Sequence, residues 1–277
     1  MNNLNENNIY TSGFMKNEMG IYEPPKSLYH YSSIESMALM LKNNSLRFTR
    51  LDTLNGVDES YAHNLPFANT AVFTSNWTSH SEESIPLWKM YTQNMEGVRI
   101  ELPVNMFIHR ELPEVSAKGG FITPQKEAIS IGRKGINLSY GSTKLQGPNK
   151  IHYSDEERFM HLGVLDKSDE KIAFNLYDLG LFKKKCWEFE QEWRFKIFAF
   201  PPEFELTDDP YFSALANPEK YPIEVSYVDF PLEPGIFNEA EFTLGPNATE
   251  AQYLILESLI EKYAPKAKVK CSNLTVK

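Results

Sequence analysis

The sequence predicts an α+β fold, and two observations support this prediction. Short strand patterns and helical patterns follow one another without the regular strand–helix alternation of a parallel α/β protein. Hydrophobic residues make up 42% of the 277 residues and aromatic residues 13%, as in a globular protein with a sizeable core. The length allows one large or two small domains. Neither an internal repeat nor a glycine-rich phosphate-binding loop occurs in the sequence.

The N-terminal part predicts a tail, a strand, a helix and a second strand. Residues 1–24 are polar, with six asparagines in the first twenty positions, and predict a flexible tail ahead of one domain over residues 25–277. Ser27–Tyr31 is a β-type run. Ser32 and Glu35 have the spacing of a capping box and predict a helix of about ten residues. Ser45–Thr49 predicts the second strand.

The middle of the chain predicts two strands and two helices. Ala71–Ser75 has strand character, and a helical stretch over Leu87–Tyr91 follows Pro86. Gly97–Leu102 alternates apolar with charged residues, as a half-buried strand does. Asp169–Lys185 has a helical pattern that ends in three lysines, where cations favour the helix dipole.

The C-terminal part begins with an aromatic and charged block, Cys186–Ile197, that predicts a strand. Within it Trp193, Phe195 and Ile197 share one face, and Glu192, Arg194 and Lys196 share the other. Further elements are predicted after this block: strands at Ile223–Phe230 and Glu241–Gly245, a last amphipathic helix capped by Thr249, and an edge strand at Lys268–Cys271.

The formal net charge of −9 disfavours indiscriminate binding to nucleic acids, because such binding needs lysine and arginine to neutralise phosphates. Residues 109–150 differ from their surroundings: seven lysines and arginines face only three acids, and six of the fourteen glycines lie there. This glycine-rich basic insert is a solvated loop in one interpretation and a nucleic-acid-binding segment in another.

Cysteine and histidine spacing argues against a metal or a disulfide framework. Cys186 and Cys271 lie 85 residues apart, and no histidine pair has a metal-helix spacing, so we expect no metal. The sequence contains no signal-peptide core and no apolar run long enough to cross a membrane, which predicts a cytoplasmic, reduced protein without a membrane partner.

Two groups of residues are candidates for a site. His30 lies between Tyr29 and Tyr31 in the first strand, where it is either a hydrogen-bonded core histidine or a ligand-binding residue. Glu190 and Glu192 point to one face if both lie in a strand. Like charges at that distance repel, so they need a cation such as Arg194 or an exposed, solvated position.

The chain resembles a bacterial family catalogued as domain of unknown function 2971 over most of residues 27–262. The resemblance rests on these segments: Leu28–Ser33, Leu46–Thr49 followed by Leu51–Glu59, Phe73–Ser75 with Leu87–Tyr91 and Glu96–Val98, and Trp187–Arg194. The chain departs from the family at Gly56–Val57, where Asp-Pro is usual, and at Lys89–Met90, where Ser or Lys-His is commoner.

A strand-borne histidine, a Thr-Ser or Tyr in the middle and a Glu-x-Glu on a late strand also resemble the three-part signature of ADP-ribosyltransferases. That resemblance implies a small split sheet, antiparallel or mixed, that holds NAD in a cleft between flanking helices, without a metal. Glu192 would stabilise the oxocarbenium-like ribose, Glu190 would act as general base, and His30 would donate a hydrogen bond to the adenosine-side ribose. The other implied cofactor-binding residues are a structural Ser75, the stacking rings of Tyr31, Trp88 and Tyr91, and Arg194.

The implied function is transfer of ADP-ribose from NAD to a macromolecular acceptor, in phage defence or as a toxin. Two alternatives stay open. One is a non-catalytic module that binds a nucleotide or a protein. The other is a nucleic-acid-binding protein that uses the basic insert at residues 109–150.

Overall fold

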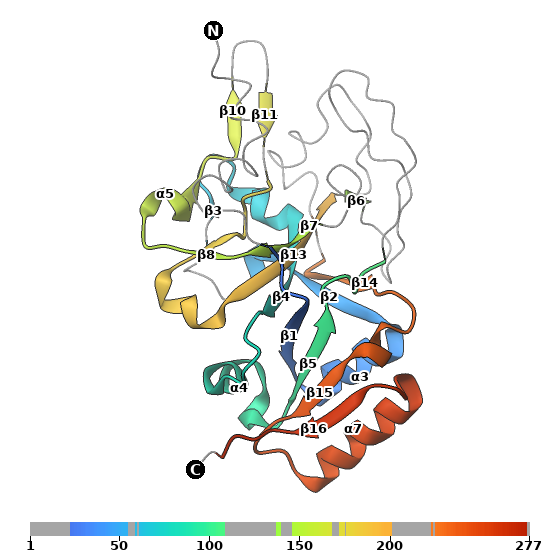
Figure 1. The fold of residues 1–277 in the computed structure, drawn as a ribbon. Helices are drawn as coiled ribbons and strands as arrows, with labels where there is room; N and C mark the ends of the chain where they lie inside the picture. Colours follow the sequence, from blue (N-terminus) through green and yellow to red (C-terminus); the bar gives the residue numbers. More distant parts are fainter. Residues whose placement is uncertain are drawn as a thin grey trace.

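The computed structural model combines helices with a mostly antiparallel sheet of many strands (Figure 1). It describes residues 23–54, 59, 61–108, 137–139, 146–167, 172–174, 176–200, 223 and 225–275. The N-terminal tail up to residue 22, residues 55–58 and most of the insert at 109–150 lie outside the described residues. The single domain over residues 25–277 stays a prediction.

The central sheet brings together strands from both ends of the chain. Its strand order is β14-β2-β4-β1-β5-β15-β16, and β13 pairs with β4, β6 and β7. The only parallel pair among the described strands of this sheet joins β15 to β16. The bounds are β1 Ser27–Ser32, β2 Ser45–Arg50, β4 Val72–Thr78, β5 Val98–Pro103, β6 Asn137–Ser139, β7 Gln146–Lys150, β13 Glu192–Phe200, β14 Tyr227–Pro231, β15 Glu241–Leu244 and β16 Lys268–Cys271.

The sheet splits along one edge of β4. On one side, β13 pairs with β4 from Thr78 to Val72. On the other side, β2 pairs with β4 at Phe73 and Thr74, whereas β1 pairs with it only at Thr78. Among the described strands, Ser75–Trp77 therefore has no strand partner on that side. We call this opening between β1 and β2 the gap.

One face of the sheet packs on two helices and forms the main hydrophobic core. Helix α3 (Ile34–Asn43), which connects β1 to β2, contributes Ile34, Met37 and Leu41, and helix α7 (Glu250–Tyr263) contributes Leu256 and Ile260. The sheet residues in this core include the alternate positions of β13 predicted to share one face. Glu192, Arg194 and Lys196 are also buried, on the opposite face.

The helix caps follow the sequence at α7 and differ by one residue at α3. Thr249 caps α7 in a full capping box with Gln252. The cap of α3 is Ser33, whose hydroxyl accepts from the Ser36 N–H, so the predicted pairing of Ser32 with Glu35 is wrong. Ser32 is still part of β1, because the strand runs one residue further than its apolar pattern indicates.

Two predicted elements between residues 169 and 191 are wrong. In place of a helix over Asp169–Lys185, the described residues form strand β11 (Ile172–Phe174), a turn with Gly180 at φ 73°, and strand β12 (Phe182–Lys183). A 3₁₀ helix then spans Lys185–Glu190 where a strand was predicted. Gln191 has a positive φ of 43°, so the backbone turns sharply before β13 begins at Glu192.

The remaining elements are short, and several lie around the upper part of the molecule in Figure 1. They are β3 Tyr61–Ala62, α4 Ile85–Tyr91, β8 His152–Tyr153, α5 Glu157–Met160, β9 His161–Leu162, β10 Leu165–Lys167, and 3₁₀ helices at Leu51–Thr53, Pro66–Ala71, Gln93–Met95 and Ile236–Glu239. In the part of the chain that is described, no helix has the length and apolar character of a membrane span.

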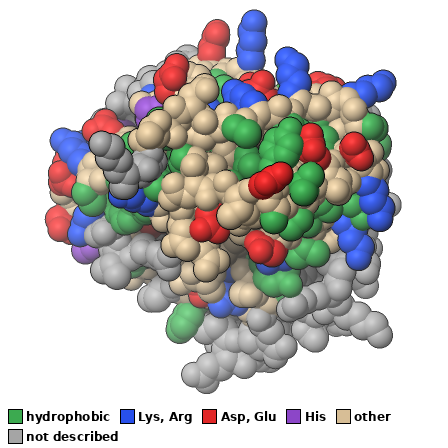
Figure 2. Space-filling model, turned by 90° about the horizontal axis from the view of Figure 1, so that it is seen from below, with side chains coloured by type: hydrophobic (Ala, Val, Ile, Leu, Met, Phe, Trp, Pro, Cys, Tyr) green, Lys and Arg blue, Asp and Glu red, His purple; other side chains and the backbone are tan. Residues whose placement is uncertain are grey.

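The face seen from below mixes exposed apolar side chains with charged ones (Figure 2). Exposed apolar residues near this end of the molecule include Leu254 and Ile255 of α7, which are 57% and 50% exposed.

Candidate functional site

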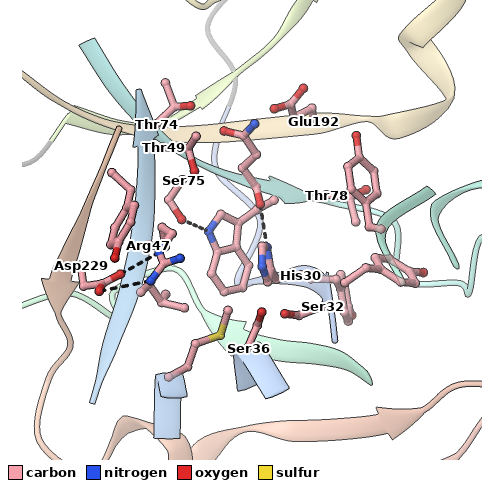
Figure 3. Close-up of a pocket in the computed structure, with 18 of the residues that line it drawn as sticks. His30, Ser32, Ser36, Arg47, Thr49, Thr74, Ser75, Thr78, Glu192 and Asp229 are labelled. Carbon is pink, nitrogen blue, oxygen red and sulfur yellow. Dashed lines mark hydrogen bonds and ion pairs between the residues drawn. The ribbon is translucent and has the colours of Figure 1, made fainter. Parts of the chain in front are cut away.

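A cavity of about 520 Å³ opens at the gap in the sheet. Residues of β1, α3, β2, β4, α4 and β14 line it, and so do Glu190 and Glu192. Figure 3 shows Glu192 on the β13 side of the cavity. A volume of this size is typical of small-molecule sites. Six residues that the sequence singled out lie on its wall: His30, Tyr31, Ser75, Tyr91, Glu190 and Glu192.

His30 occupies the gap and takes the place of a missing strand neighbour. Its Nδ1 lies 2.9 Å from the Asn76 carbonyl oxygen. A carbonyl can only accept, so Nδ1 carries the proton. Burial lowers the pKa of His30, which keeps the ring neutral and leaves Nε2 as an acceptor. His30 therefore offers an acceptor to a ligand, where the family resemblance implied a donor.

Polar atoms of β4 beside His30 have no partner among the described residues. Thr74 is 2% exposed, and its Oγ1 makes no hydrogen bond; the Asn76 Oδ1 is also buried and unbonded. The Asn76 N–H points into the gap as well, because the N–H and C=O of one residue in an antiparallel strand lie on the same side. Unsatisfied buried groups are costly, so these atoms favour a polar ligand.

Ser75 has a structural contact. Its hydroxyl accepts a hydrogen bond from the Trp77 indole N–H at 3.1 Å, both being buried in the same strand. The Trp77 ring in turn lies 5.1 Å from the His30 ring. Ser75 thus fixes the indole that forms part of the cavity wall.

Glu192 is held by two cations at the acidic end of the cavity. Its carboxylate accepts from Arg194 at 2.6 and 3.1 Å and from the Lys183 ammonium at 3.0 Å. Burial alone would raise the pKa of Glu192, but the charges of Arg194 and Lys183 outweigh it and hold this pKa below its usual value. Glu192 is therefore ionised in spite of being 4% exposed.

Glu190 comes to the same place from the end of the 3₁₀ helix. It accepts from Lys183 at 2.5 Å and from the Tyr91 hydroxyl. Burial and the neighbouring Glu192 carboxylate raise the pKa of Glu190, against the opposing charge of Lys183. The two glutamates meet although only Glu192 lies in a strand, because Lys183 draws both carboxylates to one ammonium.

Arg194 connects the site to Glu59, which lies 135 residues earlier in the sequence. It is fully buried and binds Glu59 with two guanidinium nitrogens at 2.7 and 2.8 Å. We call Glu59, Lys183, Glu190, Glu192 and Arg194 the buried ion cluster; its three carboxylates and two cations leave one negative charge in excess.

Two predicted binding residues do not line the cavity. Arg194 lies behind Glu192, and Trp88 is fully buried, with its indole N–H donating to Glu83 at 3.1 Å. The Trp88 ring meets the Tyr31 ring edge-on at a centroid distance of 4.8 Å. Arg194 therefore supports Glu192, and Trp88 supports Tyr31; both supported residues line the cavity. Of the two tyrosines that the sequence singled out, Tyr91, which is 47% exposed, is more accessible than Tyr31, which is 6% exposed.

Sequence reasoning did not identify Lys183, Glu59, Thr74 and Asn76 as site residues. Lys183 was assigned to the end of a helix, and Glu59 was named as the last residue of a segment that carries the family resemblance. No group of His, Cys, Asp and Glu in the described part of the chain is arranged to bind a metal ion.

A family described as a protein of unknown function (DUF2971) matches residues 87–195 of the chain. The match is shorter than the predicted resemblance over residues 27–262. It includes Tyr91, Glu190, Glu192 and Arg194, but it leaves His30 and Ser75 outside. No curated protein and no solved structure matches the chain significantly.

Proposed function

We propose that the cavity binds NAD and that the protein cleaves the bond between nicotinamide and ribose, transferring ADP-ribose to a macromolecular acceptor or to water. One observation carries this proposal: His30 of β1, Ser75 of β4 and Glu192 of β13 line one cavity at the gap in the sheet. They occur in the same chain order as the three-part signature of ADP-ribosyltransferases.

The chemistry assigned to Glu192 is electrostatic. When the C1′–N bond breaks, nicotinamide leaves with the bonding electron pair, and positive charge develops on the ribose. An ionised carboxylate in a desolvated site stabilises that charge, and Lys183 and Arg194 keep Glu192 ionised and fixed in position. The acceptor nucleophile then bonds to C1′.

Glu190 takes the proton that the nucleophile loses. A raised pKa brings a carboxylate closer to the operating pH, where general bases are most effective. Tyr91 donates to Glu190, so it holds the base in place and offers its ring for stacking on nicotinamide. The Nε2 atom of His30 accepts from a ribose hydroxyl.

A second candidate function is binding of a nucleotide without turnover. The observation that favours it is the pairing of both Glu192 carboxylate oxygens with cations, which leaves this group less available to a ribose hydroxyl. The third interpretation, nucleic-acid binding through residues 109–150, stays a prediction, because most of that insert lies outside the described residues.

Release of nicotinamide from NAD by the full-length protein tests the proposal. We expect turnover by the wild type, and loss of about 100-fold or more in Glu192→Gln, as when a group that stabilises transition-state charge is removed. Glu261→Gln on exposed α7 is the matched control and should behave as wild type.

Calorimetry with NAD separates the two candidate functions. Binding without consumption, with or without added cell extract as acceptor, supports the non-catalytic module. Absence of both binding and turnover contradicts both candidates.

A further inference from the structure

The cavity has a second polar end, formed by β2 and β14. The Arg47 Nε donates to the Asp229 Oδ1 at 3.0 Å, and a second Arg47 nitrogen lies 3.4 Å from the other oxygen. The guanidinium carbon lies 3.6 Å above the centre of the Tyr227 ring. In Figure 3, Arg47 and Asp229 lie to the left of His30, and Glu192 lies above it on β13.

This arrangement presents a carboxylate of fixed orientation to the cavity. The planar Arg47 fork occupies one acceptor position on each Asp229 oxygen, and stacking on Tyr227 holds the fork in place. A carboxylate has about four acceptor positions, so Asp229 can still accept from ligand hydroxyls. Its side chain is 35% exposed, which leaves those positions accessible.

We infer that Asp229 is a specificity-determining residue that accepts a hydrogen bond from the 2′-hydroxyl of the adenosine ribose and so selects NAD over its 2′-phosphorylated form, NADP. The inference rests on the proposed function. With nicotinamide at the Glu192 end, the adenosine half of the ligand extends toward Arg47 and Asp229. An acidic residue on this hydroxyl is the common device of NAD-binding sites of other folds.

The charges around this end disfavour a phosphate. Arg47 is the only lysine or arginine among the described residues that line the cavity, and Asp229 already neutralises it. The other charged groups on the described wall are Glu190 and Glu192. A 2′-phosphate placed beside Asp229 therefore meets a like charge and finds no unpaired cation there.

Removing the Asp229 carboxylate should weaken or reverse the preference for NAD over NADP. In Asp229→Asn the ribose hydroxyl loses a charged acceptor, and the charge of Arg47, no longer neutralised by a carboxylate, can attract a phosphate. In Arg47→Met the carboxylate remains, so discrimination against the phosphate should persist or increase. The two variants thus separate the effect of the carboxylate from that of the ion pair.

Calorimetric titration of the full-length protein with NAD and with NADP tests the inference. We expect the wild type and Glu261→Gln to bind NAD about tenfold or more tightly than NADP, because like-charge juxtaposition is strongly unfavourable at an interface. We expect Asp229→Asn to lose that preference or to reverse it, and Arg47→Met to keep it. Melting temperatures establish that each variant is folded.

Three results would overturn the inference. If the wild type binds NAD and NADP equally, or if Asp229→Asn keeps the wild-type ratio, or if Arg47→Met loses the preference, Asp229 does not select the ligand, although NAD binding stands. If the wild type binds neither dinucleotide, the proposed function fails together with the inference.

Discussion

The ion pairs at the two ends of the cavity differ in their exposure to solvent. At one end, the Arg194 side chain is 0% exposed and the Glu192 side chain 5%. At the other end, the side chains of Arg47 and Asp229 are 45% and 35% exposed. Coulomb attraction is strong in the buried cluster and largely offset by solvent at the exposed pair, so the first constrains the fold and the second contributes little to it.

Because of this difference in exposure, the buried ion cluster is suited to fixing charged groups in position and the exposed pair to recognising a ligand. A buried charge has a large desolvation penalty, and only excellent geometry compensates for it, so the buried ion cluster keeps one arrangement. The exposed pair can exchange partners at small cost when a ligand arrives. The acidic end is therefore suited to hold charge still during a reaction, and the Arg47 end is suited to discriminate among ligands.

Arg194→Met should have the largest effect on stability. It removes the guanidinium that pairs with both Glu59 and Glu192 and leaves Lys183 as the one cation of the cluster beside three buried carboxylates. Loss of one partner of a buried pair costs about 3–5 kcal/mol. Urea denaturation measures the difference. The matched control is Arg47→Met, which should cost at most about 1 kcal/mol. Equal losses in the two variants would contradict the distinction between the two ends.

Glu192→Gln should destabilise the protein less than Arg194→Met. The substitution removes the excess negative charge of the buried ion cluster, since two carboxylates then face two cations. It weakens charged hydrogen bonds, for which about 1–3 kcal/mol is typical. Urea denaturation of both variants in parallel checks this order. If Glu192→Gln is the more destabilising, the cluster does not carry an excess negative charge.

The sequence indicated part of this cluster because part of it has a local pattern. Glu192 and Arg194 alternate with apolar residues along β13, so their common face could be predicted from a period of two. Lys183 and Glu59 could not be predicted in the same way. Lys183 lies in β12 and pairs with Glu192, and Glu59 pairs with Arg194 from 135 residues away in the sequence. Tertiary packing brings them together, and no spacing in the sequence records it.

The secondary structure, too, could be predicted only where the sequence has a clear local pattern. Strands with clear alternation, such as Val98–Pro103, and the capped helix at Glu250–Tyr263 were predicted close to their bounds. The region from residue 169 to 191 was not, because its helical pattern is overridden by Gly180 and Gln191 at positive φ and by burial of Lys183 in the ion cluster. The gap in the sheet was implied only by the family resemblance, since it depends on which strands pair with β4.

Glu190→Gln should change the pH dependence of stability. The pKa of Glu190 is raised in the folded protein, so the folded state binds this proton more tightly than the unfolded state does. Wild-type stability from this group therefore falls as the pH rises above the unfolded pKa and through the folded one. Gln can still accept from Tyr91 and Lys183, so the difference at low pH should stay within about 1 kcal/mol.

Urea denaturation between pH 4 and pH 8 measures this effect. The stability of Glu190→Gln relative to wild type should increase with pH. Glu188→Gln, an exposed change two residues away, should show no such trend. A relative stability of Glu190→Gln that decreases as the pH rises would mean that the Lys183 ammonium outweighs burial and Glu192 in setting this pKa.

Asp229→Asn should have the smallest effect on stability. The pair it disrupts is half exposed, and such pairs contribute about 0–1 kcal/mol. Asn can still accept one hydrogen bond from Arg47, and stacking of the guanidinium on Tyr227 does not depend on the carboxylate. Thermal unfolding of the free protein should therefore hardly change, whereas a loss as large as that in Arg194→Met would make the Arg47 end a structural element too.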